Sequence, residues 1–253
     1  ERGPVHVHGL GVNPADGALF VATHTGLFRA APGERKAARV GDSRQDTMGF
    51  TVVGPDRFLG SGHPDARAAL PPLLGLLESR DGGRTWRPVS LLGEADFHVL
   101  RYAGTRLYGY DVTGERLLVS RDHGRTWEER ELPGPLLDLA VDPADPSRLL
   151  AVAAGPAGDG TYESRDGGRS WTYASEMVGL LAWPAPGRLY VADAGGVVSL
   201  SSDRGRTFER RGAVGGEPAA LLAHSGELYA ALHDGTIVRS RDGGRTWSVR
   251  SEP

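Results

Sequence analysis

The sequence predicts an all-β fold, a six-bladed β-propeller built from four-stranded antiparallel blades. The first observation is a phrase of eight residues that occurs five times, beginning at Ser79, Ser120, Ser164, Ser201 and Ser240. The second is its spacing, because the aspartates of the phrase stand at positions 81, 122, 166, 203 and 242, which are 41, 44, 37 and 39 residues apart. The third is that short runs of β-forming residues separate the copies. A period of about 40 residues filled with short strands is typical of propeller blades.

We expect one domain over residues 1–253, with blades at about 1–45, 46–92, 93–132, 133–174, 175–213 and 214–253. We name the four strands of a blade A to D from the centre outward. In the last blade they are expected at 218–223, 227–232, 235–240 and 245–250, the last two flanking a copy of the phrase. The first blade lacks the phrase but keeps candidate strands at 5–12, 18–22, 26–30 and 34–40. Residues 64–72 form an insertion between strands B and C of the second blade.

The repeated phrase, Ser-x-Asp-x-Gly-x-Thr-Trp, has the composition of a hairpin loop. The carboxylate can accept hydrogen bonds from the backbone of the turn, the glycine allows a positive φ, and the tryptophan covers the blade edge. The phrase resembles the Asp-box, or BNR repeat, of sialidases, sortilin-like receptors and photosystem assembly propellers, over nearly the whole chain. In that family the boxes lie on outer hairpins away from the site. The resemblance therefore implies a structural role for Asp81, Asp122, Asp166, Asp203 and Asp242.

Composition narrows the functional classes. The formal net charge is −3, from 29 basic and 32 acidic residues, so no long-range field favours nucleic acid as a partner. The chain has no cysteine, which excludes disulfides, zinc–thiolate sites and thiol nucleophiles. No apolar run approaches the roughly 20 residues that cross a bilayer. We expect a monomer without a membrane span, and we expect any export signal to have been removed before Glu1.

Histidines gather in the first three blades and at one kind of position. Aligning the blades places His24, His63 and His233 at the end of strand B, and His6, His8, Asp46, Met48, Asp96 and His98 near the start of strand A. Because strands A and B are antiparallel neighbours, the start of A and the end of B lie on the same rim, opposite the hairpins of the repeated phrase. His6 stands two residues before His8, so strand alternation would turn both toward the same side.

Neutral imidazoles that converge in this way suit a transition metal, and a thioether shifts the preference toward copper. We therefore predict a copper site with His8, His24, His63, His98 and Met48 as ligands, and with His6, Asp46, Asp96 and His233 as further ligands or as partners that orient an imidazole. An isolated histidine at a strand end is more often a solvated polar residue than a ligand. The prediction therefore depends on the alignment of the blades.

The local phrases around these residues also resemble a bacterial subgroup of Asp-box propellers. They are residues 6–11, 23–28, 60–65 and 94–100. Members of that subgroup are labelled glycosyl hydrolases or sialidase-like proteins and are often exported lipoproteins. The resemblance implies an extracytoplasmic location and favours a role in copper handling.

Two other functions stay open. A sialidase-like enzyme would need an arginine triad, a tyrosine nucleophile and an aspartic acid/base, and the Arg-Ile-Pro phrase that marks the first sialidase arginine is absent. Ordinary glycoside hydrolysis would need a carboxylate pair, for which Asp111, Asp138 and Asp193 are candidates. A protein-binding scaffold would use an exposed patch, for which the leucine-rich residues 66–77 are the candidate.

Overall fold

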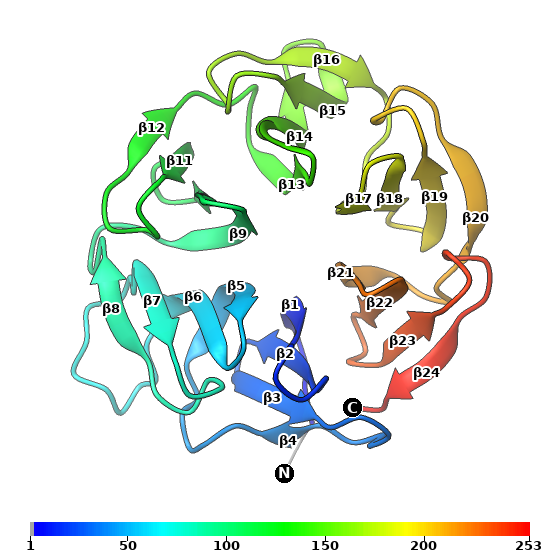
Figure 1. Ribbon diagram of the computed structural model, residues 1–253. Helices are drawn as coiled ribbons and strands as arrows, with labels where there is room; N and C mark the ends of the chain where they lie inside the picture. Colours follow the sequence, from blue (N-terminus) through cyan, green and yellow to red (C-terminus); the bar gives the residue numbers. More distant parts are fainter. Residues whose placement is uncertain (1–2) are drawn as a thin grey trace.

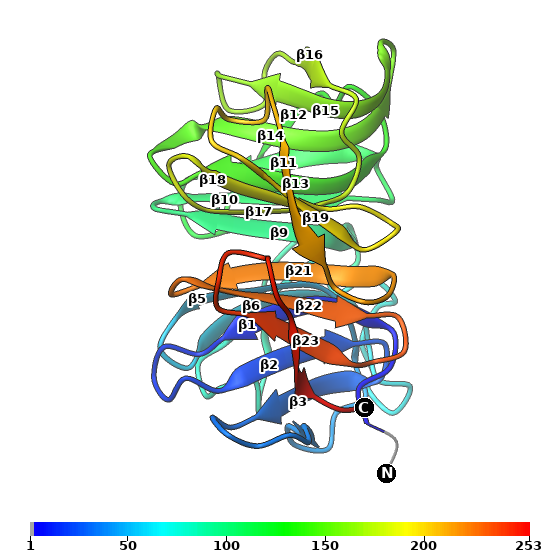
Figure 2. The same cartoon turned by 90° about the vertical axis from the view of Figure 1, so that its right-hand side faces the viewer.

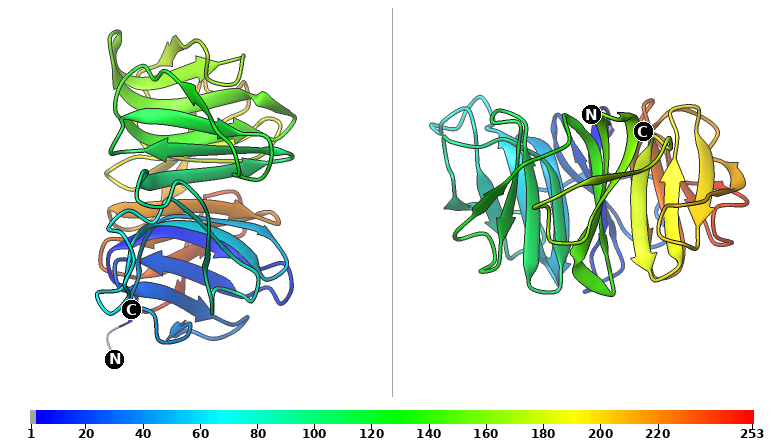
Figure 3. Two further views of the ribbon diagram at one scale, coloured as in Figure 1. Left: turned by 90° about the vertical axis from the view of Figure 1, so that its left-hand side faces the viewer. Right: turned by 90° about the horizontal axis from the view of Figure 1, so that it is seen from above.

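A computed structural model describes residues 3–253 and shows a closed ring of six sheets around a central channel (Figure 1). Each sheet has four antiparallel strands in chain order, with the first strand at the centre. The predicted six-bladed β-propeller is confirmed. In edge-on views the strands run across the thickness of the ring (Figures 2 and 3). Over residues 3–253 no helix is long and apolar enough to cross a membrane.

Every blade takes its strands A to D from one contiguous stretch of chain. Blades 1 and 2 consist of β1 (Val7–Val12), β2 (Leu19–Thr23), β3 (Gly26–Ala30), β4 (Ala38–Arg39), β5 (Asp46–Gly54), β6 (Arg57–His63), β7 (Leu76–Ser79) and β8 (Arg87–Ser90). Blades 3 and 4 consist of β9 (Phe97–Ala103), β10 (Arg106–Asp111), β11 (Arg116–Ser120), β12 (Glu128–Arg130), β13 (Leu136–Asp142), β14 (Asp145–Gly155), β15 (Gly158–Ser164) and β16 (Thr172–Ser175). Blades 5 and 6 consist of β17 (Leu180–Ala185), β18 (Arg188–Ala192), β19 (Val197–Ser201), β20 (Glu209–Ala213), β21 (Pro218–His224), β22 (Glu227–Leu232), β23 (Ile237–Ser240) and β24 (Ser248–Ser251).

The hydrophobic core lies between blades rather than at the centre of the ring. It divides into six clusters, and each cluster joins two neighbouring blades. Between blades 1 and 2, for example, the rings of Phe20 and Phe58 lie edge to face with centroids 4.7 Å apart, and Phe50 packs against Phe58 at 5.6 Å. Full burial of such a side chain contributes about 1.5–3 kcal/mol, so these layers hold the ring closed.

The aromatic residue of each repeated phrase packs onto the cluster shared with the preceding blade. Trp86 joins the layer between blades 1 and 2, and Trp127, Trp171, Phe208 and Trp247 repeat this arrangement around the ring. Blade 1 has no such phrase, and the layer between blades 6 and 1 has no such aromatic residue among its described members.

The junction of blades 6 and 1, which we call the seam, is closed by the C-terminal segment instead. The Arg250 guanidinium is buried and donates hydrogen bonds to the backbone carbonyls of Ala30, Ala31 and Glu34 in blade 1. The backbone amide of Glu252 donates to the carbonyl of Arg35 at 2.8 Å, and the side chains of these two residues form an ion pair at 2.7 Å. At the seam, backbone and charge contacts thus take the place of the aromatic residue of the repeated phrase.

A central cavity of about 510 Å³ opens between the innermost strands. These strands form the inner wall of the ring, and β1 contacts both β5 and β21 (Figure 1). His8, His98, Arg101 and Asp138 line the cavity on the side of blades 1, 3 and 4, whereas Leu181, Trp183 and Leu221 line it from blades 5 and 6. Polar chemistry is therefore concentrated on one side of the channel.

Candidate metal centre

A β-bulge near the start of strand A turns one side chain of a blade toward the channel. The pairing with strand B shifts register there in five blades, and the extra residues are His8, Met48 with Gly49, His98, Leu137 and Ala219. Four of these blades place the bulge residue in the wall of the central cavity: His8, His98, Leu137 and Ala219. A bulge re-aims a side chain locally, so the repeated fold presents an imidazole to the channel in blades 1 and 3.

The end of strand B presents a second histidine on the same rim. The backbone amide of His24 donates to the carbonyl of His6 at 3.2 Å, and that of His233 donates to Glu217 at 3.1 Å. In blade 2 His63 pairs with Asp46. His24, His63 and His233 therefore occupy one equivalent position, each opposite a residue at or just before the start of strand A in its own blade.

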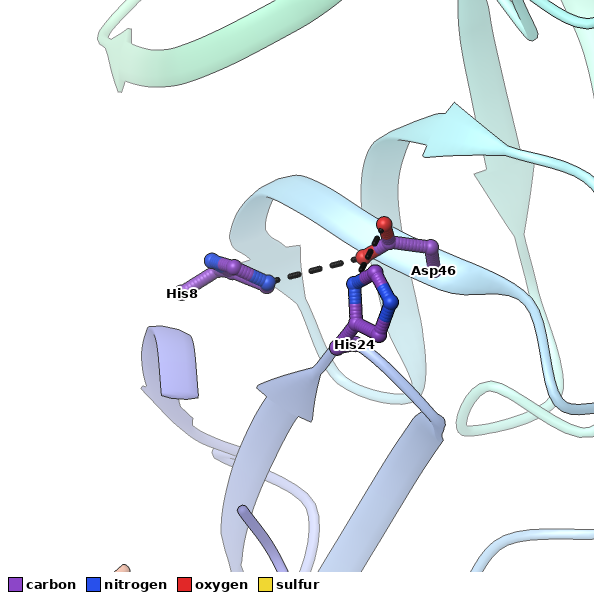
Figure 4. Close-up of side chains that lie close together, drawn as sticks. All are labelled: His8, His24 and Asp46. Carbon is purple, nitrogen blue, oxygen red and sulfur yellow. Dashed lines mark ion pairs between the residues drawn. The ribbon is translucent and has the colours of Figure 1, made fainter. Parts of the chain in front are cut away.

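His8 and His24 of blade 1 meet Asp46 of blade 2, and we call these three residues the first His–Asp group (Figure 4). Nδ1 of His24 lies 2.8 Å from Oδ2 of Asp46, and Nε2 of His8 lies 3.5 Å from Oδ1 (dashed in Figure 4). One ligand atom from each residue lies within 4.8 Å of the other two. Imidazole and carboxylate ligands bind a transition metal at about 2.0–2.2 Å, so small side-chain rotations would bring all three onto one ion.

Two polar atoms of the first His–Asp group are buried without a hydrogen bond. They are Nε2 of His8 and Oδ1 of Asp46, the two atoms that face each other at 3.5 Å. Asp46 is only 9 % exposed, so its carboxylate oxygen is not solvated. Leaving such atoms unpaired costs about 1–3 kcal/mol each. A cation placed between them would satisfy both, so the residues present fit a metal ion.

His6 lies beside the first His–Asp group but not as strand alternation predicts. It precedes β1, is exposed, and has a positive φ of 52°, so its side chain does not follow the two-residue period that leads to His8. Its ring centroid nevertheless lies 6.3 Å from that of His24, the same separation as between His8 and His24. A third imidazole is thus available next to the group.

His63 of blade 2 and His98 of blade 3 meet Asp96 of blade 3, and we call these residues the second His–Asp group. Oδ2 of Asp96 lies 3.0 Å from Nε2 of His98 and 3.5 Å from Nε2 of His63. Asp96 is 3 % exposed, and its other oxygen, Oδ1, is buried without a hydrogen bond. The other ring nitrogen of His63, Nδ1, lies 2.9 Å from the carbonyl oxygen of Pro72 in the insertion.

The four predicted histidine ligands are therefore shared between two carboxylates. Over residues 3–253 the first His–Asp group alone has three ligand atoms that all lie within 4.8 Å of one another, so the four histidines do not form one tight set. Half-buried Met48 lies at the bulge of β5, in the blade between the two groups, and stays a predicted ligand. His233 lies apart from both groups, with Nε2 3.9 Å from Oε1 of exposed Glu217.

The sequence predicted Asp46 and Asp96 only as further ligands or as partners that orient an imidazole, whereas in the structure each carboxylate lies between two histidines. A signal for this was present, because both stand two residues before a bulge residue, as Asp46-Thr47-Met48 and Asp96-Phe97-His98. The carbonyl of Pro72 and the bulges themselves had no signal in the sequence.

The aspartates of the repeated phrase stabilise their own hairpins on the opposite rim. In each copy the carboxylate accepts hydrogen bonds from the serine hydroxyl and from the backbone and hydroxyl of the Thr or Ser four residues later. The hydroxyl of Thr207 and its backbone amide lower the pKa of Asp203 to about 2, and Ser170 does the same for Asp166. These carboxylates are saturated and remote from both groups.

The three carboxylates considered for glycoside hydrolysis are engaged as well. Asp111 is fully buried and bonds the Arg116 guanidinium at 2.9 Å. Asp138 is buried and accepts from Arg101 and from the backbone amides of residues 139 and 181. Asp193 accepts from the backbone of its own turn. Asp111 and Asp138 are thus buried and held by their partners, whereas Asp193 has a single backbone bond to one carboxylate oxygen.

Comparisons with known proteins give the fold. Residues 216–240, which cover β21 to β23, match a family model described as strictosidine synthase-like, N-terminal, a span too short to show the family of the chain. No curated protein matches.

Several solved structures are similar over most of the chain. A YCF48 protein bound to a D1 peptide is 15% identical with a TM-score of 0.59, and the match covers 98% of this chain and 83% of that one. A gluconolactonase from Xanthomonas campestris is 12% identical with a TM-score of 0.71, covering 90% and 83%. A chain of a nidogen/laminin complex is 14% identical with a TM-score of 0.70, covering 93% of each. At such identities the likeness concerns architecture alone. By fold, the chain is a β-propeller.

Proposed function

We propose that this protein binds a transition-metal ion, copper, at one rim of the propeller channel and works outside the cytoplasm. The observation that carries the proposal is the first His–Asp group. Two imidazoles from blade 1 and a carboxylate from blade 2 converge within 4.8 Å, and two of their buried atoms have no hydrogen bond. His8, His24 and Asp46 are the ligands in this proposal.

The group leaves room for a further ligand. The side chain of His24 is 62% exposed, and His6 lies beside it on the solvent side. An ion held by His8, His24 and Asp46 would thus have an accessible position, as in sites that exchange or use their metal, rather than the closed tetrahedral shell of a structural site. This accessibility favours binding and release of a metal over a purely structural role.

Copper is proposed on ligand chemistry. Imidazole and carboxylate ligands accept several divalent metals, with Cu²⁺ bound most tightly in the first-row series, and a thioether favours Cu(I). Met48 is two residues from Asp46 and is one of only two methionines in the chain. We expect Met48→Leu to weaken Cu(I) binding at least tenfold and to leave Zn(II) binding unchanged. Equal effects on both metals would remove Met48 from the proposal.

The proposed extracytoplasmic location depends on the resemblance of residues 6–11, 23–28, 60–65 and 94–100 to exported propellers. The lack of cysteine is compatible with it, because the fold requires no thiol that an oxidising compartment would modify. Cell fractionation of the producing organism, followed by detection with an antibody, tests the location directly.

The ligands are tested by metal titration of the purified protein. We expect the double variant His8→Ala, His24→Ala to lose high-affinity Cu(II) binding in equilibrium dialysis with metal analysis. The matched control is His233→Ala, which removes an exposed histidine from the equivalent position in blade 6 and should bind copper as the wild type does. Unchanged binding by the double variant would overturn the proposed site.

The alternatives have less support. Of the carboxylates considered for hydrolysis, Asp111 and Asp138 are buried in ion pairs with arginines, which leaves Asp193 without a paired carboxylate. For a protein-binding scaffold, the insertion after β6 exposes Leu70 at 44%, and a solved YCF48 propeller of similar fold has a peptide bound. The same insertion, however, is fixed to the ring, because Asp65 accepts from the backbone amide of Arg44 at 2.8 Å and Pro72 bonds His63. Its anchoring connects it to the histidine-bearing rim.

A further inference from the structure

We propose that His63, Asp96 and His98 form a second cation site, one blade further around the ring, which takes up a metal ion independently of the first. The inference rests on the proposed function for the kind of ion bound. It goes beyond that function in dividing the predicted ligands between two ions instead of one.

The repeat itself places equivalent residues at both junctions. At the junction of blades 1 and 2, the end of strand B supplies His24 and the start of the next strand A supplies Asp46. At the junction of blades 2 and 3, the same two positions supply His63 and Asp96. A rotation by one blade about the propeller axis therefore places the pair His24 and Asp46 onto the pair His63 and Asp96.

The pattern stops beyond these two junctions. At the junction of blades 3 and 4 the equivalent positions hold Val112 and Pro135, and at the seam they hold His233 and His6. Neither offers a carboxylate opposite an imidazole. The bulge residues of blades 4 and 6, Leu137 and Ala219, are apolar as well. Among the four junctions compared, two thus pair an imidazole of one blade with a carboxylate of the next.

The hydrogen bond of His63 to the insertion fixes what its other nitrogen can do. The carbonyl of Pro72 only accepts, so Nδ1 of His63 carries a hydrogen. In the neutral ring Nε2 then presents a lone pair to Oδ2 of Asp96, 3.5 Å away. Two lone pairs facing each other repel unless a proton or a metal cation lies between them. A histidine that donates through one nitrogen to a backbone carbonyl and binds metal through the other is a common arrangement.

Asp96 supplies the second, independent sign of a ligand. Its carboxylate is buried, and Oδ1 has no hydrogen bond while Oδ2 faces both imidazoles. A buried carboxylate is unfavourable unless a counter-charge is close. The side chains of His63 and His98 are 42% and 35% exposed, so an ion can reach both rings from solvent. Because their nitrogens start farther apart than those of the first His–Asp group, we expect the second site to fill at a higher metal concentration.

The experiment measures the number of ions bound by the wild type and by one double variant for each group. Metal-free protein is dialysed against increasing Cu(II), and separately Zn(II), and bound metal per chain is determined. We expect two ions for the wild type and one for His63→Ala, His98→Ala, with the tighter ion retained. We expect one, the weaker, for His8→Ala, His24→Ala. Asp96→Asn, nearly identical in shape, should lose the weaker ion without the loss of two side chains, which controls for misfolding.

The outcomes separate the two proposals. One ion in the wild type that survives in the His63, His98 variant and in Asp96→Asn would overturn the second site and leave the first intact, with a proton between His63 and Asp96. A single ion in the wild type that is lost in both double variants would also overturn the second site, because it would show one site shared by all four histidines. Loss of the tighter ion in the His63, His98 variant alone would contradict the proposed first site. No bound ion in the wild type would refute both.

Discussion

Replacing Asp46 by Asn tests whether its carboxylate is a metal ligand or only a structural ion-pair partner of the histidines. The amide keeps the shape of the side chain but removes the negative charge that lies 2.8 Å from His24 and 3.5 Å from His8. If Asp46 is a ligand, we expect metal affinity to fall by at least about 100-fold, because the loss of a residue that only supports a ligand already costs about 10–100-fold. The metal-free protein should keep its stability within about 1 kcal/mol, since a buried carboxylate with an unpaired oxygen is itself unfavourable.

The magnitude follows from linkage between binding and unfolding. At a free metal concentration of about 100 times Kd, a bound ion raises the free energy of unfolding by about 2.7 kcal/mol, and a 100-fold weaker variant at the same concentration gains only about 0.4 kcal/mol. For a domain of this size, thermal unfolding should show a metal-induced shift of roughly 5–10 °C in the wild type and roughly 1–2 °C in the variant. Glu217→Gln, at the equivalent position of blade 6, should respond as the wild type does.

One result would refute this reasoning. Asp46 is buried but His24 is largely exposed, so the loss of a structural hydrogen bond to this charged group would cost about 1.5–3 kcal/mol. A loss of that size in metal-free Asp46→Asn, together with an undiminished metal response, would show that Asp46 holds blades 1 and 2 together as a structural ion pair and does not bind metal.

Three further predictions concern the scaffold. Replacing Asp203 by Asn should lower the free energy of unfolding near neutral pH. The pKa of Asp203 is depressed to about 2 from an ordinary 3.8, so its ionised carboxylate stabilises the fold above about pH 4. In urea titrations at several pH values, the difference in stability from the wild type should shrink as the pH falls through about 2. Arg250→Met should lower the free energy of unfolding in urea by about 2–4 kcal/mol, since it removes the charged donor that closes the seam. The control Arg245→Ala, at an exposed arginine, should change stability by less than about 0.5 kcal/mol. Equal effects of the two substitutions would contradict the role of Arg250 at the seam. Gly62→Ala should lower both the melting temperature and copper affinity, because φ is +132° and a new Cβ would lie 2.1 Å from the carbonyl oxygen of Asp46; a variant unchanged in both would show that strand β5 gives way easily.

The fold could be predicted because its information is local and repeated. Each copy of the phrase specifies a hairpin through its own hydrogen bonds, as Ser201, Asp203 and Thr207 show, and the period between copies sets the size of a blade. The number of blades followed from the five copies together with the four candidate strands at 5–40, which lie before the first copy. The weakest expected strand, at 34–40, is correspondingly short in the structure, with β4 confined to Ala38–Arg39.

The arrangement of the site depends on features that a single strand does not reveal. Aligning the blades with one another placed His24 and His63 at equivalent strand ends, as the structure does. A bulge, however, is a property of two paired strands, and its extra residue at His8 breaks the alternation from which side-chain direction was inferred. Likewise, which histidine meets which carboxylate depends on the offset between neighbouring blades. Asp46 therefore faces the imidazoles of the preceding blade, and the predicted single cluster becomes two His–Asp groups.

Because every sheet takes its four strands from one contiguous stretch of chain, the ring of blades does not depend on which blade comes first in the sequence. Gly3 packs against Pro253, so a short peptide linker could join these ends while new ends are cut in the connection between any two other blades. Such circularly permuted chains should assemble the same toroid. In a chain cut between blades 1 and 2, these two blades would meet only when the ring closes, and a cut between blades 2 and 3 would do the same for that pair.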